Sequence, residues 1–194
     1  MEFVTLYNDV KVPVLGIGTF MISPEDTEKS VYSALRDGYR MIDTANAYLN
    51  EEAVGKALKR AFDEGVVTRE EVFVSTKLWP TLYENENAVA GTLERLGLDY
   101  VDLLFIHQPA GNFMAGYRQL EKANPEGKAR SLGISNMDGE KLERLLSESE
   151  IKPHVIQSWR PTPTAPRGRL WPKLPPTAPS SWAGIPWATA TPAL

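Results

Sequence analysis

The chain has 194 residues, which is enough for one ordinary domain with a sizeable core. Its net charge of -4 without a basic run argues against a nucleic-acid partner, and the absence of cysteine together with only two histidines argues against disulfides and a Cys- or His-rich metal site. No apolar run approaches the ~18 residues that span a bilayer, and the first twenty residues lack a long apolar core, so we expect a cytoplasmic protein without a signal peptide or membrane contact.

Strands and helices are predicted to alternate along most of the chain. Two β-rich runs on either side of Asn8 and Asp9 predict a hairpin over residues 4–13. Pro24 early in an apolar-periodic segment, followed by acidic residues, marks the first helix start. Expected strands cover residues 15–20, 40–45, 72–77, 101–107, 129–134 and 154–157, and expected helices cover residues 24–36, 51–64, 86–96, 114–123 and 138–147.

This alternation, with nearly continuous apolar strands, predicts an α/β fold with a parallel sheet and helices outside. Two architectures compete. A doubly wound dinucleotide fold requires G-x-G-x-x-G at the first strand–helix turn, but Gly16 and Gly18 are followed by Met21 where the third glycine belongs. A (β/α)8 barrel has its chemistry at the carboxyl ends of several strands. Polar residues stand at several predicted strand ends of this chain, which favours the barrel.

Polar side chains stand where the predicted strands end: Asp43, Lys77, His107 and the pair Ser135 and Asn136. Taken singly, each has an ordinary structural interpretation as a cap, a turn former or a solvated charge. Their recurrence at consecutive strand ends predicts one shared site, and Tyr48 follows Asp43 closely enough to join it.

A phenol has a pKa of about 10, which is high for an acid at neutral pH. We expect the Lys77 ammonium to lower the pKa of Tyr48 and Asp43 to keep the lysine charged and oriented. His107 is then placed to hydrogen-bond a carbonyl oxygen. Since no side chain supplies hydride, the predicted proton donation to a carbonyl requires a nicotinamide or flavin.

The chain from residue 3 to residue 157 resembles the aldo-keto reductase family, with the family's segments in order. The residues that carry the resemblance are GIGTF at 16–20, IDTA at 42–45, Tyr48, NEEAVG at 50–55, STKLW at 75–79, IHQP at 106–109, GKARSLGISN at 127–136 and VIQ at 155–157.

The resemblance implies a (β/α)8 barrel that binds NADPH without a dinucleotide domain and reduces an aldehyde or ketone. About six of the eight strands are recognisable after the N-terminal hairpin, so we expect an incomplete barrel. The roles implied are Asp43, Tyr48, Lys77 and His107 as the catalytic set, with Tyr48 the general acid; Gly18, Thr19, Asp43, Ser135, Asn136 and Gln157 for the cofactor; and Phe20, Trp79 and His107 around a small carbonyl substrate. His154 has no such counterpart and is expected to be structural.

The composition changes after Gln157. Residues 158–194 contain four basic residues, no acidic residue, nine of the 15 prolines and four of the five tryptophans. We therefore divide the chain into a partial barrel at 1–157 and an irregular tail at 158–194. Back-translation of residues 159–165 and 182–192 in a frame displaced by one base yields segments similar to the family's. We hypothesise a reading-frame shift, which the sequence of the coding DNA tests.

An incomplete barrel has open sheet edges and an exposed core, which make it prone to aggregation. We also expect weak or absent NADPH binding by this chain. Two alternatives to a reductase remain: a non-catalytic relative that binds a nucleotide or a partner, and an inactive truncated product. The intact catalytic set disfavours the first alternative.

Overall fold

A computed structural model describes residues 1–157, and its strands form a two-stranded hairpin and one six-stranded parallel sheet. The hairpin pairs β1 (Phe3–Thr5) with β2 (Lys11–Pro13). In the sheet, neighbours follow chain order from β3 to β8. Its strands are β3 (Ile17–Gly18), β4 (Met41–Asp43), β5 (Phe73–Leu78), β6 (Val101–Ile106), β7 (Ala129–Ser135) and β8 (Val155–Gln157).

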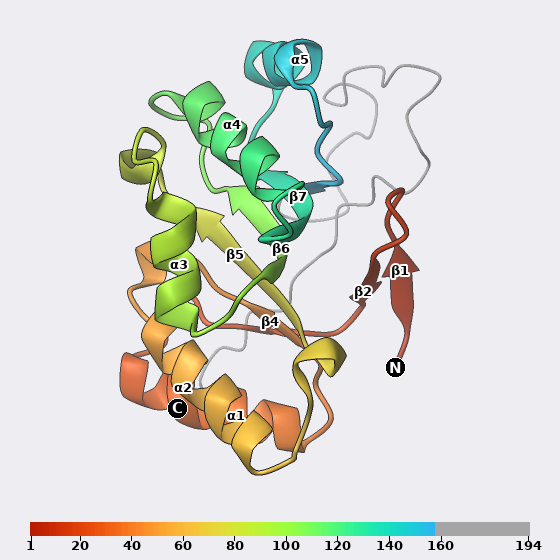
Figure 1. The fold of residues 1–194 in the computed structure, drawn as a ribbon, viewed down its shortest axis with the longest axis vertical. Coiled ribbons are helices and arrows are strands. Elements are labelled where there is room, and N and C mark those ends of the chain that lie inside the picture. Colours follow the sequence, from red (N-terminus) through yellow and green to blue (C-terminus); the bar gives the residue numbers. More distant parts are fainter. Residues whose placement is uncertain (158–194) are drawn as a thin grey trace, which may run out of the picture.

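Helices cover the outer side of this sheet, as Figure 1 shows. Each helix connects one parallel strand to the next. The sheet itself curls into part of a barrel (Figure 1). They are α1 (Pro24–Arg36), α2 (Glu51–Asp63), α3 (Ala88–Leu96), α4 (Phe113–Ala123) and α5 (Gly139–Glu148), with short 3-10 helices η1 (Asn46–Tyr48), η2 (Arg69–Glu71) and η3 (Pro80–Leu82).

The predicted incomplete (β/α)8 barrel with an N-terminal hairpin is confirmed. The main difference lies at the first strand, which was expected over residues 15–20 and is paired only at Ile17 and Gly18. Thr19 adds a hydrogen bond from its backbone N–H to the Asp43 carbonyl before the chain turns away from the sheet.

Two apolar clusters hold the described residues together. The larger lies between the sheet and the helices. The smaller lies inside the curve of the sheet, where hairpin side chains meet strand side chains, and burial of each such side chain contributes roughly 1.5–3 kcal/mol. Its members are Leu6, Val10, Val12, Met41, Phe73, Leu103, Phe105 and Val155.

Contacts of Tyr7 fix the hairpin against the segment that leads into β8. The Tyr7 hydroxyl donates to the Lys152 carbonyl at 2.5 Å, and its ring stacks on His154 with centroids 4.6 Å apart. His154 is buried, and its Nδ1 accepts a hydrogen bond from the Leu132 backbone N–H at 3.0 Å. These contacts give His154 a structural role, as predicted.

Within residues 1–157, no helix has the length and apolar character needed to cross a membrane. The predicted irregular tail at 158–194, and with it the division of the chain at Gln157, falls outside the described residues.

Candidate active site

The carboxyl ends of adjacent strands bring the predicted site residues to one edge of the sheet. In the register of the sheet, Gly18 of β3 pairs with Asp43 of β4, and Asp43 pairs with Ser75 of β5. Lys77 lies two residues beyond Ser75, so its side chain leaves the same face of the strand. Parallel pairing therefore places Ser75 and Lys77 next to the Asp43 carboxylate.

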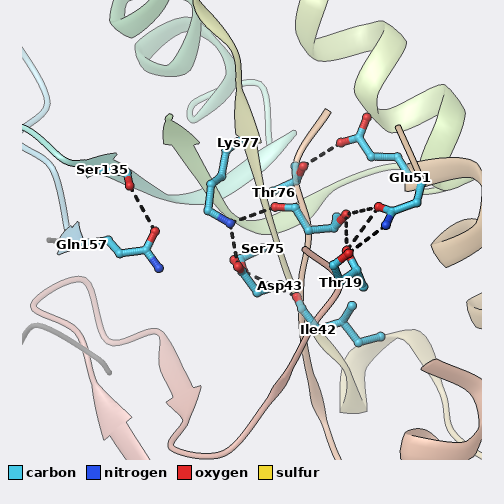
Figure 2. A network of polar contacts seen from close by, with 11 residues as sticks. Thr19, Ile42, Asp43, Glu51, Ser75, Thr76, Lys77, Ser135 and Gln157 are labelled. Carbon is cyan, nitrogen blue, oxygen red and sulfur yellow. Dashed lines mark hydrogen bonds and ion pairs between the residues drawn. The ribbon is translucent and has the colours of Figure 1, made fainter. Parts of the chain in front are cut away.

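Asp43 and Lys77 form a buried ion pair. Nζ of Lys77 donates to Oδ2 of Asp43 at 2.6 Å and to the Thr44 carbonyl at 2.9 Å (Figure 2). Asp43 is 7% exposed and Lys77 is 2% exposed. A charge pair sealed from water to this degree depends on close geometry, because each ion alone would carry an uncompensated desolvation cost.

Tyr48 ends the 3-10 helix η1, close to this ion pair. Its ring centroid lies 5.3 Å from Nζ of Lys77, 5.0 Å from the Phe20 ring and 5.7 Å from the His107 ring, which it meets edge-on. The next residue, Leu49, adopts a left-handed conformation that ends η1. The tight turn thus brings the phenol back over the strand ends.

The expected lowering of the Tyr48 pKa is wrong for this geometry. Burial, and then the Asp43 carboxylate, raise the pKa of the phenol above its ordinary value of 10. The Lys77 ammonium faces Asp43, which compensates part of its charge, so burial of the phenol dominates the direction of the shift. Tyr48 therefore remains protonated, which is the form that donates a proton.

His107 follows β6 and is 8% exposed. Its Nδ1 is buried, and no side chain or backbone group in the described part of the chain hydrogen-bonds to it. Burial and the Lys77 charge lower the pKa of His107 to about 4, while Asp43 opposes this shift. The imidazole is therefore neutral at pH 7. Trp79 meets the His107 ring edge-on, with centroids 5.0 Å apart. Together with Tyr48 and Phe20, it forms an aromatic surround next to His107.

A second group of polar residues lies at the ends of β7 and β8. The Ser135 hydroxyl donates to Oε1 of Gln157 at 3.2 Å (Figure 2), and the Asn136 backbone N–H donates to the Gln157 carbonyl at 2.8 Å. Asn136 has a φ of 58°, so the chain turns sharply just past β7. These hydroxyl and amide groups can pair with a carboxamide.

Gly18 and Thr19 differ in what they offer a ligand. A Cβ built at Gly18 meets no atom within 4 Å, so this side of the strand end is open. Thr19 is fully buried, and its hydroxyl contacts Thr44 and Asn50 at 2.9 Å and 3.2 Å. The Thr19 side chain therefore belongs to an internal network.

Sequence reasoning missed the centre of that network. Asn50 is 1% exposed, and its amide nitrogen donates to the carbonyls of Thr19 and Ile22 and to the hydroxyl of Thr27. Its Oδ1 contacts Thr44. Asn50 thus ties the β3–α1 connection to the start of α2, two residues after Tyr48. Its position just before the helix start gives no sign of these partners.

Comparison with known proteins places these observations in a family. The model of the aldo/keto reductase family matches residues 14–160. Glyoxal reductase of Bacillus subtilis is 42% identical over 161 residues, covering 80% of this chain and 57% of that protein. Methylglyoxal reductase DkgA of Yersinia pestis is 42% identical over 158 residues, covering 79% and 56%.

The fold has a counterpart among solved structures. The crystal structure of an aldo-keto reductase of Bombyx mori in complex with NADP superposes with a TM-score of 0.75 at 34% identity, covering 81% of this chain and 57% of that one. The chain therefore spans somewhat more than half the length of each of these relatives.

Proposed function

The chain belongs to the aldo/keto reductase family, and from that membership we propose that it reduces the carbonyl group of an aldehyde or ketone to an alcohol with NADPH, with Tyr48 as the proton donor. One observation carries the proposal. The Tyr48 phenol lies between a buried Lys77–Asp43 ion pair and a neutral His107 imidazole, at the strand ends of a barrel.

Each member of this set has a distinct task. Tyr48 keeps its proton until a substrate oxygen gains negative charge and can accept that proton, because burial raises the pKa of the phenol. Lys77 then stabilises the phenolate left behind, since its ammonium lies 5.3 Å from the ring centroid. Asp43 holds that ammonium in place at 2.6 Å.

His107 orients the substrate. A neutral imidazole can donate one hydrogen bond, and its low pKa ensures that it stays neutral at pH 7. It adds no positive charge near the Lys77 ammonium. A carbonyl oxygen held between His107 and the Tyr48 hydroxyl is thus placed for proton transfer.

The residues at the strand ends fit a nicotinamide. Ser135, Asn136 and Gln157 present the hydroxyl and amide groups that suit its carboxamide, and Gly18 leaves the adjoining space open. We propose that these residues hold the cofactor ring beside Asp43, with the Thr19 backbone at the border. Bound NADPH would supply the hydride that this chain's side chains lack.

The substrate proposal rests on the aromatic surround. Phe20 is 53% exposed and Trp79 is 37% exposed, and both lie next to members of the catalytic set. Their apolar faces suit the body of a small carbonyl compound. The names of the two bacterial relatives, glyoxal and methylglyoxal reductase, support compact aldehydes as first substrates to test. A cytoplasmic location stays a prediction.

Deuterium transfer tests the proposed reaction. The full chain is incubated with methylglyoxal and NADPH that carries deuterium at both C4 positions. We expect an alcohol product with one added deuterium by mass spectrometry, and the unlabelled alcohol with ordinary NADPH. If no labelled alcohol forms even at millimolar NADPH, the proposal fails and the non-catalytic alternative gains support.

A further inference from the structure

We propose that Ser75 is a positioning residue, which acts through Asp43 to determine how the Lys77 ammonium faces Tyr48. The inference rests on the proposed function. Ser75 is fully buried and pairs with Asp43 across β4 and β5. Its hydroxyl donates to Oδ1 of Asp43 at 2.6 Å, and Lys77 donates to Oδ2 at the same distance (Figure 2).

Ser75 and Lys77 donate to different oxygens of the Asp43 carboxylate. A carboxylate whose oxygens are both free can rotate and take an ammonium on either or both of them. With Oδ1 engaged by Ser75, the contact to Lys77 is confined to Oδ2. Lys77 has three N–H donors, and Asp43 and the Thr44 carbonyl take two of them. The third donor makes no hydrogen bond within residues 1–157, and the ammonium lies 5.3 Å from the Tyr48 ring centroid.

The geometry favours Asp43 as the partner of Ser75. The other acceptor within reach of the hydroxyl is the Ile42 carbonyl at 3.5 Å, at the long limit of a hydrogen bond. Hydrogen bonds to charged groups are shorter and stronger than neutral ones, so the 2.6 Å contact dominates. Without it, a buried carboxylate oxygen loses its donor, and the Asp43–Lys77 pair becomes free to shift.

Thr76 offers a matched control. It is also fully buried on β5, but its hydroxyl donates to Oε1 of Glu51 at 2.6 Å, on the opposite face of the strand. Thr76→Val removes a hydroxyl of the same kind at the same hydrogen-bond length while leaving the Asp43 contacts in place. Ser75→Ala removes the proposed positioning contact, and Ser75→Thr keeps the hydroxyl.

The first readout is the exchange rate of the Lys77 ammonium protons, measured by NMR on the full chain with 15N-labelled lysine. Lys77→Met identifies the signal. Loss of a hydrogen bond to a charged group corresponds to at least about a tenfold change in equilibrium, so we expect exchange to be about tenfold faster in Ser75→Ala. It should be unchanged in Thr76→Val and close to the parent rate in Ser75→Thr.

The second readout is the kinetics of methylglyoxal reduction as a function of pH. We expect Ser75→Ala to lower kcat about tenfold with KM within about twofold, and to displace the pH profile, whereas Thr76→Val keeps the parent profile. Ser75→Cys, with a weak thiol donor in nearly the same volume, replaces Ser75→Ala if that variant does not fold by circular dichroism.

Equal exchange rates in Ser75→Ala and Thr76→Val would overturn the inference, as would a Lys77 ammonium that exchanges at the rate of surface lysines in the parent. Failure of the proposed function has a different signature. A parent chain that reduces no carbonyl compound rejects the reductase proposal, while the NMR comparison still decides whether Ser75 positions the ion pair.

Discussion

Nζ of Lys77 lies 2.6 Å from Oδ2 of Asp43, and both side chains are almost sealed from solvent. Two opposite charges are therefore held at the strand ends of a partly closed barrel, where each has little contact with solvent. After burial, the charges of this pair are the next causes of the pKa shifts of Tyr48 and His107.

Asp43→Asn should destabilise the fold strongly, because it leaves the Lys77 ammonium buried without its counter-ion. Removal of one partner from a buried pair typically costs about 3–5 kcal/mol of unfolding free energy. Urea denaturation of the variant and the parent measures this loss. Lys59 and Asp63 provide the control, since their pair has the same 2.6 Å separation but is exposed. Lys59→Ala should cost less than about 1 kcal/mol. Comparable losses in the two variants would contradict the assigned burial.

Acid should destabilise the fold through its two histidines. Burial lowers the pKa of His107 and of His154 from 6.5 to about 4. Between these values the unfolded chain binds protons that the folded chain does not, so stability rises with pH across this window. The contribution is complete above pH 6.5 and is lost as pH falls toward 4, by roughly 2–3 kcal/mol per histidine.

His154→Asn tests the share of that one histidine. The asparagine oxygen can accept the Leu132 N–H in place of Nδ1 and does not titrate. Urea denaturation between pH 4 and pH 8 should show a shallower pH dependence for the variant than for the parent. Identical slopes would show that His154 is not held neutral by the fold.

Leu49→Gly should stabilise the fold. Leu49 has a φ of 58° and is 85% exposed, so its side chain adds left-handed strain and little burial. Relief of that strain is worth roughly 1 kcal/mol, partly offset by the entropy of glycine in the unfolded chain. Leu49→Ala keeps the Cβ and should not show the gain. A lower melting temperature for the glycine variant would mean that the leucine contributes packing.

NADPH should bind this chain weakly. The contacts proposed for residues 1–157 reach only the nicotinamide end of the cofactor. A fluorescence titration should give a dissociation constant weaker than micromolar. Micromolar or tighter binding would contradict this expectation and would show that the chain holds the rest of the cofactor by other means.

Much of the fold was predictable because its signals are local. Continuous apolar runs and helical periodicity identified five of the six parallel strands and all five helices with small shifts at their ends. The first strand was predicted too long, because residues 15–20 are apolar but only Ile17 and Gly18 pair. Pairing depends on the neighbouring strand, which no local window contains.

The candidate site shows the same contrast between local signals and contacts with distant residues. Asp43, Lys77 and His107 could be proposed from the sequence because each ends an apolar run, and their catalytic roles stay predictions. Asn50 and Ser75 were missed because their roles depend on partners 31 and 32 residues away. The direction of the Tyr48 pKa shift was also missed, since it depends on burial and on the prior pairing of Lys77 with Asp43.

The central claim is that Tyr48 donates the proton in carbonyl reduction, and Tyr48→Phe tests it most directly because it removes one hydroxyl and keeps the ring. Carbonyl-dependent NADPH oxidation is followed at 340 nm with saturating methylglyoxal and high NADPH. We predict slow but measurable oxidation by the parent chain and its loss in Tyr48→Phe, with circular dichroism unchanged. Equal rates in the two proteins would contradict the claim.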